Sequence, residues 1–179
     1  MTYWFTGDWH LFHRNVIALC NRPFVSLDEM HEVLQARINY RVKERDRLVV
    51  MGDLAFGRPA GLAKWLDGLK CKNLIVCWGN HDATAKKLHK LEPGRFKQTG
   101  DIIEIKWQRV KVVCCHYAMR TWRSSGKGAL HVYGHSHGNL PVENNRSMDV
   151  GIDTNIYSAP YSLEEIIEQV GHQPFNPHH

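Results

Sequence analysis

The sequence predicts an α/β fold, a layered α/β-β/α sandwich of mixed parallel and antiparallel sheets flanked by helices. Three observations predict it. Short apolar runs alternate with segments of helical periodicity in the first half, which is typical of a parallel sheet covered by helices. Strand-like runs follow one another closely in the second half, which favours antiparallel neighbours. Asp, Asn and His residues come directly after the apolar runs, as at the carboxyl edge of such a sheet.

Strands and helices are expected to alternate as far as residue 91. A capping box, Ser26 to Glu29, opens the longest expected helix, in which Met30, Leu34 and Ile38 recur at helical spacing. Apolar and β-branched runs that end in Gly mark the buried strands. Strands are therefore expected at 3–6, 48–51 and 74–78, and helices at 16–20, 27–44, 60–69 and 83–91.

The second half is expected to be richer in strands. Runs at 101–106 and 109–115 are separated by a tight turn, so they are expected to pair antiparallel. Shorter strands are expected at 129–133 and 148–152. A second capping box, Ser162 to Glu165, begins a helix that should end near Gly171.

Length and composition favour one domain without a membrane span. The chain has 179 residues, of which 43% are hydrophobic and 23% charged. No stretch approaches the roughly 20 apolar residues of a membrane helix, and the N-terminus lacks the pattern of a signal peptide. We therefore expect a cytoplasmic protein with a single domain at 1–171 and a flexible tail at 172–179, whose terminal His pair is left out of the functional argument.

Charge and cysteine content narrow the class further. The formal net charge of +5 favours anionic substrates, but no long basic block is present. The five cysteines have no C-x-x-C spacing, so buried free thiols in a reducing compartment are expected. No thiolate stands among the polar residues at the strand ends, which argues against a structural zinc site.

The polar residues at the strand ends form a candidate metal site. Carboxylate, amide and imidazole groups from five strand ends are expected to meet at one edge of the fold. A carboxylate can bridge two cations, and Asp53 is best placed to do so. A mixed N/O ligand set suits Mn, Fe, Zn, Ni or Co better than Mg or Ca, and we expect two ions, with Mn²⁺ preferred. The candidate ligands are Asp8, His10, Asp53, Asn80, His116, His135 and His137.

These residues lie in five motifs that resemble those of the calcineurin-like metallophosphoesterases. In order they are Asp8-x-His10, Gly52-Asp53, Gly79-Asn80-His81-Asp82, His116 and Gly134-His135-Ser136-His137. Each is weak alone, whereas the five together, spanning residues 8 to 137, are highly specific. The chain is most similar to the short single-domain bacterial and phage members. One departure is Gly7, where Ser is more usual, and it touches no expected ligand.

The resemblance implies residue roles. One metal would take Asp8, His10, Asp53 and His137, and the other Asp53, Asn80, His116 and His135. A hydroxide bridging the ions would attack phosphorus in line. His81 would act as general acid on the leaving oxygen, and Asp82 would orient His81 through its far ring nitrogen.

Candidate substrate-binding residues come from the arginines that follow two of the motifs. Arg22 and Arg120 are the first choices and Arg123 is a further one, because a guanidinium suits phosphate oxygens; solvated surface is the alternative for each. His13 lies close enough to Asp8 in sequence to touch substrate. Other histidines lack the strand-end setting and are expected to be non-ligands.

Three functions remain open from the sequence. The first is a metal-dependent phosphodiesterase or phosphatase acting on small phosphoesters or nucleotides. The second is a nuclease on DNA or RNA with the same chemistry, which ranks lower because no long basic stripe is present. The third is a catalytically silent metal-binding scaffold, which ranks lower because every motif position is filled. No membrane partner is expected, and the sequence does not predict an oligomeric state.

Overall fold

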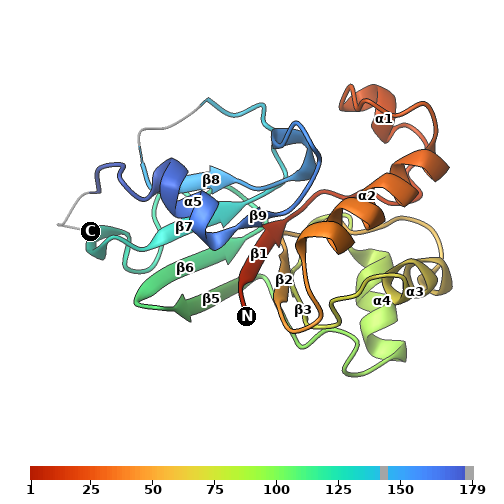
Figure 1. The fold of residues 1–179 in the computed structure, drawn as a ribbon, viewed down its shortest axis with the longest axis horizontal. Helices are drawn as coiled ribbons and strands as arrows, with labels where there is room; N and C mark the ends of the chain where they lie inside the picture. The colour runs from red at the N-terminus through yellow and green to blue at the C-terminus, as the bar shows by residue number, and fades with distance from the viewer. Residues whose placement is uncertain (142–144, 176–179) are drawn as a thin grey trace.

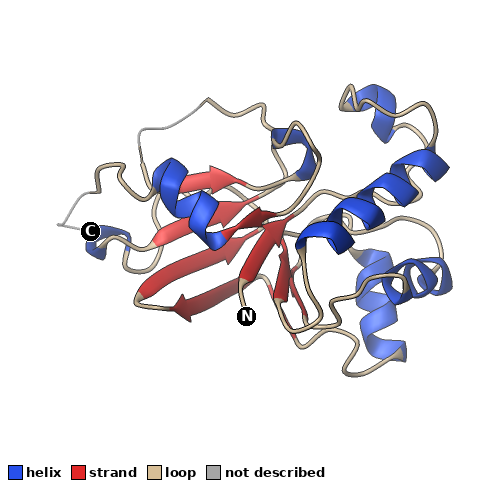
Figure 2. Ribbon diagram, viewed as in Figure 1, coloured by secondary structure: helices blue, strands red, loops and turns tan. Residues whose placement is uncertain are grey.

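The computed structural model describes residues 1–141 and 145–175. Two sheets pack face to face, and three helices cover the outer face of the larger one (Figure 1). The predicted layered α/β sandwich is confirmed. Figure 2 shows the strands gathered at the centre and the helices outside them.

The five-stranded sheet has the order β4-β3-β2-β1-β9. Its strands β1 to β4 run parallel, and β9 pairs antiparallel with β1. The first three strands were predicted, but β4 and β9 were not, because they are only three and two residues long and too short to show a period. The strands are β1 (Tyr3–Thr6), β2 (Arg47–Val50), β3 (Leu74–Cys77), β4 (Gln98–Gly100) and β9 (Tyr161–Ser162).

The four-stranded sheet has the order β5-β6-β7-β8. β5 and β6 form the predicted antiparallel hairpin, whose turn residues Gln108 and Arg109 both have positive φ. β6, β7 and β8 are parallel, so the expected antiparallel character holds for the hairpin alone. The strands are β5 (Ile102–Trp107), β6 (Val110–Cys115), β7 (Leu130–Tyr133) and β8 (Ser147–Asp149).

Alternate residues of the central strands point into two separate cores. On β2, Leu48 and Val50 pack among the helices, whereas Val49 packs against the second sheet. A strand buried on both faces has an unbroken apolar sequence, which explains the continuous runs of β2 and β3. Packing on both faces holds these strands in place and so positions the residues that follow their carboxyl ends.

The helices cover the outer face of the larger sheet and one end of the sandwich. α2, α3 and α4 supply the apolar side chains of the first core, and α5 packs against β1, β8 and β9. Short 3₁₀ turns lie at Ser125–Lys127 and Ile152–Thr154. The helices are α1 (Val16–Leu19), α2 (Leu27–Arg41), α3 (Pro59–Asp67), α4 (Ala83–Leu91) and α5 (Leu163–Val170).

The two predicted capping boxes differ in the structure. Ser162 and Glu165 form the complete reciprocal pair at α5. At α2, Ser26 Oγ accepts from the Glu29 amide, but the Glu29 carboxylate accepts instead from the amide of Val25. At α2 the Glu29 carboxylate therefore binds the amide one residue before the N-cap residue, where a complete capping box would use the amide of Ser26 itself.

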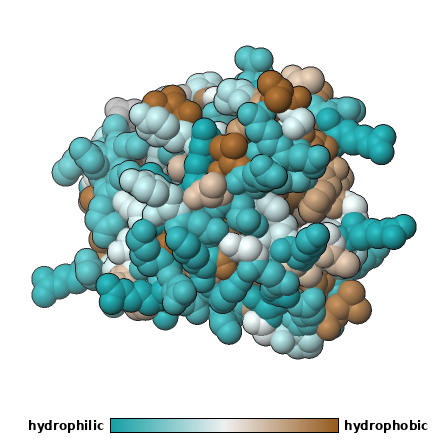
Figure 3. Space-filling view, turned by 45° about the vertical axis from the view of Figure 1, so that its right-hand side comes forward, coloured by the Kyte–Doolittle hydropathy of each residue, from teal (hydrophilic) through white to brown (hydrophobic). Residues whose placement is uncertain are grey.

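The C-terminal segment and the surface complete the fold. Arg146 donates to the Gln173 carbonyl and lies over the Phe175 ring, so residues 172–175 of the expected tail contact the domain; residues 176–179 lie outside the described residues. The face in Figure 3 is largely hydrophilic, with apolar side chains in small separate patches. Among the described residues, no helix has the length and apolar character to cross a membrane.

Candidate metal centre

The candidate ligands follow strand ends of both sheets. Asp8 follows β1, Asp53 follows β2, Asn80 follows β3, His116 follows β6 and His135 follows β7. Hydrogen bonds from a backbone amide to a carboxylate join two of these segments across the two sheets. The His135 amide donates to both carboxylate oxygens of Asp8, at 3.0 and 2.9 Å. The sandwich thus brings residues more than a hundred positions apart to one edge.

The backbone at this edge is in an uncommon conformation. Five of the seven candidate ligands have φ between 49° and 65°, in the left-handed region that non-glycine residues rarely occupy. Such conformations occur at functional sites, where the surrounding structure holds them against their strain. The five residues are Asp8, His10, Asp53, His135 and His137.

Glycines allow the polypeptide to pass close to the Asp8 carboxylate. A Cβ on Gly134 would lie 2.7 Å from Asp8 Oδ2, and one on Gly151 would lie 2.5 Å from the same oxygen. Both distances are shorter than a side chain tolerates, so these positions require glycine. The carboxylate is therefore enclosed by backbone on two sides.

Three groups of potential ligand atoms are found among the described residues; one consists of Cys20, His137 and Asp153, and the other two contain Asp8. Ligand atoms of Asp8, His10 and His137 lie within 4.8 Å of one another, and so do those of Asp8, Asp53 and His116. Asp8 is common to these two groups, whereas the sequence pointed to Asp53 as the shared carboxylate. His135 is in none of the three groups, although its ring centroid lies 5.0 Å from that of His116. Asn80 Oδ1 lies 2.9 Å from His116 Nε2.

The charge balance of the enclosure fits a bound cation. Neither ring nitrogen of His10 has a hydrogen-bond partner among the described residues, although both are buried. Burial, the nearby His137 and the Arg22 charge lower the pKa of His10 to about 3, so its ring is neutral with a free lone pair. Burial raises the pKa of Asp8 well above its usual value, with Asp149 and Asp53 adding to the effect. A divalent cation would supply the missing ligand partner and the missing positive charge.

Hydrogen bonds orient two further candidate ligands. Nδ1 of His116 lies 2.5 Å from the Met51 carbonyl, which can only accept, so Nδ1 carries the proton and Nε2 faces Asp53 at 3.6 Å. Nδ1 of His137 is bonded to Asp153 Oδ2 at 2.6 Å, which leaves Nε2 for a ligand. This is the arrangement that fixes metal-binding imidazoles in other proteins.

Comparison with known proteins assigns the site to a family. The family model described as calcineurin-like phosphoesterase matches residues 1–176. The chain belongs to the calcineurin-like phosphoesterase family. It is accordingly a metal-dependent phosphoesterase, and the candidate ligand groups described above are consistent with that assignment.

Individual relatives of this phosphoesterase agree in extent and fold. MJ1445 of Methanocaldococcus jannaschii, an uncharacterized protein, is 25% identical over 170 residues, covering 92% of this chain and 88% of its own. The crystal structure of AQ665 from Aquifex aeolicus, a protein of unknown function, has a TM-score of 0.73 at 21% identity and covers 94% of this chain and 99% of its own. A structure described as a novel archaeal phosphodiesterase has a TM-score of 0.51 at 17% identity, covering 84% and 82%. These two structures show that the fold is shared.

The predicted catalytic pair of the phosphoesterase occupies two different environments. His81 is exposed beside the candidate ligands, with its ring centroid 5.7 Å from that of His10 and its amide donating to Asp53 Oδ1. Asp82 is buried, and its oxygens accept from the amides of Asp53, Leu54 and Gly79. The Asp82 carboxylate thus joins the loops after β2 and β3, and no hydrogen bond links it to His81 among the described residues; its role in orienting His81 stays a prediction.

The arginines expected at the substrate are placed differently. All three guanidinium nitrogens of Arg22 are bonded within the protein, to Asp153, to the carbonyls of Asp8 and Trp9, and to Met30 Sδ. Its side chain is only 1% exposed, so this guanidinium braces the first motif and presents no free N–H to a substrate. Arg120 is exposed, and Arg123 pairs with Glu104 at 3.0 Å.

Two other histidines, His13 and His131, have different surroundings. His13 lies at the edge of the site, its ring stacked on Phe56 with centroids 4.5 Å apart and its Nδ1 buried and unpartnered among the described residues. His131 was expected to be a non-ligand, and both of its nitrogens are bonded to backbone groups.

Two acidic residues that support the site were missed from the sequence. Asp153 bridges His137 and Arg22, and Asp149 accepts from Ser136 Oγ and from the amides of Gly138 and Gly151. Together they fix the loop that carries His135 and His137. The signal was present in Asp149-Val150-Gly151-Ile152-Asp153, where one carboxylate ends a short strand and another follows it, but it lay beyond the last recognised motif.

A small cavity opens beside His135. Its volume is about 380 Å³, and its walls include Tyr117, Leu140 and the backbone around Gly134. Tyr117 packs edge-on against His135, with ring centroids 4.8 Å apart. A partly apolar recess therefore lies directly next to the candidate metal ligands.

Proposed function

We propose that this phosphoesterase hydrolyses phosphodiesters of small molecules at a dinuclear metal centre by in-line displacement at phosphorus. The first ion would be held by Asp8, His10, Asp53 and His137, and the second by Asp53, Asn80, His116 and His135, with Mn²⁺ as the preferred metal. Two divalent ions supply, when bound, the acidity that activates water and the positive charge that stabilises the transition state. The free cysteines, four of five buried, fit a cytoplasmic location.

One observation carries this proposal. His10 places two buried, unpartnered nitrogens beside the buried carboxylates of Asp8 and Asp53. Buried polar groups are normally hydrogen-bonded, and buried carboxylates are normally paired with a charge. A metal ion bound to one His10 nitrogen and to the carboxylates would supply a partner for that nitrogen and a compensating charge.

The chain's own residues are assigned the remaining steps. His81 would donate a proton to the leaving oxygen, because its side chain is exposed to substrate. The hydrogen bond from its backbone amide to Asp53 Oδ1 fixes its position. Arg22 and Asp82 are positioning residues, which hold the first and the middle motifs in place. Arg120 remains a candidate for contacting the phosphate, since its guanidinium is exposed beyond β6.

The recess beside His135 supports a diester in preference to a monoester. A diester carries a second organic group that must lie somewhere next to the metals. The side chains of Tyr117 and Leu140 offer an apolar surface for it, in a cavity of about 380 Å³. A monoester would leave this surface unused, and a polynucleotide would need a basic track that the composition does not suggest.

The experiment is hydrolysis of bis(p-nitrophenyl) phosphate by metal-stripped protein to which Mn²⁺, Ni²⁺, Co²⁺, Fe²⁺ or Zn²⁺ is returned. Turnover restored by metal, and faster than with p-nitrophenyl phosphate, is expected. Absence of turnover with every metal would overturn the proposal and favour a silent scaffold. Cleavage of oligonucleotides in preference to small diesters, with binding that weakens steeply as salt rises, would favour a nuclease.

A further inference from the structure

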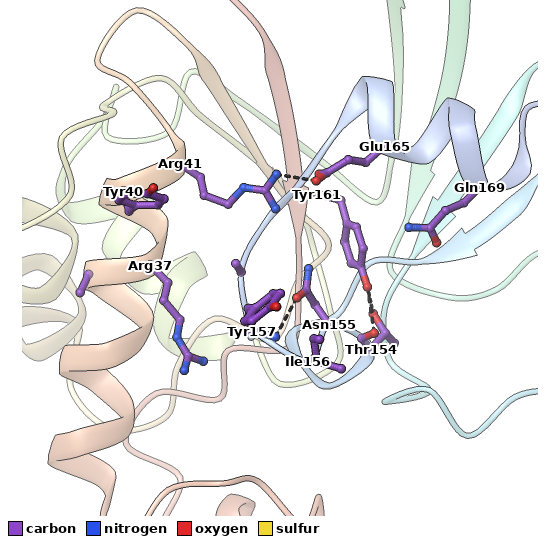
Figure 4. A pocket seen from close by; sticks show the side chains of 12 residues that line it. Arg37, Tyr40, Arg41, Thr154, Asn155, Ile156, Tyr157, Tyr161, Glu165 and Gln169 are labelled. Atoms are coloured by element: carbon purple, nitrogen blue, oxygen red, sulfur yellow. Dashed lines mark hydrogen bonds and ion pairs between the residues drawn. The ribbon is translucent and has the colours of Figure 1, made fainter.

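A second cavity lies between α2 and the segment that follows Asp153. Its volume is about 1060 Å³, and it is bounded by α2, residues 154–161 and α5 (Figure 4). None of the candidate metal ligands, and neither His81 nor Asp82, lines it. Small-molecule sites in proteins have volumes of roughly 300–1,000 Å³, so the cavity has room for a ligand of nucleotide size.

Two arginines reach from α2 toward this cavity, and they differ in their pairing. Arg41 is neutralised by Glu165 at 2.5 Å and lies over the Trp4 ring. Nη1 of Arg37 is buried and has no hydrogen-bond partner among the described residues, and Cζ of its guanidinium lies 5.9 Å from the centroid of the Phe24 ring. Figure 4 shows the Arg37 side chain extending from α2 on the side of Tyr157. Arg37 itself is half-buried, and its unpartnered Nη1 leaves a cationic donor for which an anionic ligand is a suitable acceptor.

Aromatic and amide side chains line the rest of the cavity. Tyr40 and Tyr157 are 80% and 66% exposed as residues, which is unusual for residues of this size. They offer flat faces on which a planar ring can stack. Gln169 on α5 lines the cavity with an amide that makes no hydrogen bond to any described residue, so a donor and an acceptor are available to the ligand.

From these groups we infer that the cavity is a nucleotide-binding site separate from the metal centre. The phosphate would bind the Arg37 guanidinium, and the base would stack on Tyr157 or Tyr40, with Gln169 within the same cavity to bond its edge. A phosphate offers the paired oxygens that match a guanidinium fork. A planar heterocycle uses the aromatic faces, which an inorganic anion would leave in water.

The floor of the cavity is continuous with the support of the metal centre. The Tyr161 hydroxyl donates to the Thr154 carbonyl at 2.9 Å, and Thr154 Oγ1 donates to the Gly151 carbonyl at 2.8 Å. Thr154 directly follows Asp153, the partner of His137. The two sites are therefore separate in their lining but share one supporting segment.

Calorimetric titration with adenosine 5′-monophosphate and with inorganic phosphate tests the inference. The protein is used as purified, together with four variants. The monophosphate should bind the parent and Asp53→Asn alike, because Asp53 is not among the residues that line the cavity. Arg37→Gln should weaken binding roughly 10–100-fold, the loss expected for hydrogen bonds to a charged group. The matched control Arg45→Gln removes an exposed charge next to α2 and should leave the affinity unchanged.

A fourth variant separates the base from the phosphate. Tyr157→Ala should weaken binding of the monophosphate and leave that of inorganic phosphate unaltered. Any one of four results would overturn the inference: no binding at millimolar ligand, equal affinity in Arg37→Gln, loss of binding in Asp53→Asn, or inorganic phosphate binding as tightly as the nucleotide. A dimer in sedimentation that Tyr157→Ala dissociates would also overturn it, because a second copy of the chain would then occupy the cavity.

Discussion

His10 Nε2 lies 3.5 Å from Asp53 Oδ2, and no described residue hydrogen-bonds either ring nitrogen of His10. Under the proposed function both residues would be metal ligands, and Asp53 would be shared by the two ions.

Asp53→Asn should therefore abolish metal-dependent hydrolysis and lower the bound metal from two ions to at most one. An amide lacks the charge and the second anionic oxygen needed to bridge two cations. Metal analysis by mass spectrometry and the rate with bis(p-nitrophenyl) phosphate measure the two effects. Asp28→Asn on the exposed side of α2 is the matched control; full metal content and activity in Asp53→Asn would refute the bridging role.

His81→Ala should lower kcat by about 10²–10⁴-fold on diesters with poor leaving groups. The loss should be much smaller on p-nitrophenyl esters, whose leaving group needs no proton. Metal content should match that of the parent, because His81 is assigned no ligand role. Equal losses on alkyl and p-nitrophenyl esters would argue against protonation of the leaving group.

Asp153→Asn should weaken metal binding by about 10–100-fold, the range found when the partner of a metal-binding histidine is removed. The variant loses the charge that faces both His137 and Arg22. Activity should recover when the metal concentration is raised, since the ligands themselves are intact. A reduced kcat at saturating metal, with unchanged metal affinity, would contradict this positioning role.

Asp46 provides a test of pH-dependent stability far from the metals. Burial acts to raise the pKa of Asp46, but hydrogen bonds from the amides of Lys43 and Thr2 and from the Trp4 indole outweigh it and lower the pKa below 3.8. A lowered folded-state pKa means that the stabilisation is complete above the unfolded-state pKa and is lost as the pH falls through the folded one.

Asp46→Asn should therefore reduce the free energy of unfolding by about 1–2 kcal/mol at pH 7, and the difference from the parent should shrink toward pH 3. Urea unfolding at the two pH values measures it. A difference that is constant with pH would show that the carboxylate charge does not contribute.

Much of the fold could be predicted because local signals are strong in this chain. The run Leu48 to Met51 is apolar on both faces, as expected of a strand that is covered on both sides. The capping box of Ser162 and Glu165 predicts the start of α5. β4 and β9 could not be predicted, since pairing with a neighbour defines them and their two or three residues carry no pattern of their own.

The residues of the candidate site also fall into a group that the sequence could indicate and a group that it could not. Residues next to strand ends, such as Asp8 and Asp53, could be recognised from position and residue type. The roles of Arg22, Asp82 and Asp153 depend on which distant groups the fold brings to them. Arg22 was expected at the substrate because arginine suits phosphate, yet its nitrogens meet a carboxylate 131 positions away and two backbone carbonyls.

That separation of Arg22 and Asp153 has a consequence for biosynthesis. During translation, Asp8, His10 and Arg22 are synthesised and emerge from the ribosome long before His137 and Asp153. Until the later residues emerge, a nascent chain has an incomplete set of candidate ligands, and the Arg22 guanidinium lacks its partner, the Asp153 carboxylate. Under the proposed function, the ligand set and its supporting carboxylate would therefore be complete only after residue 153 has emerged from the ribosome.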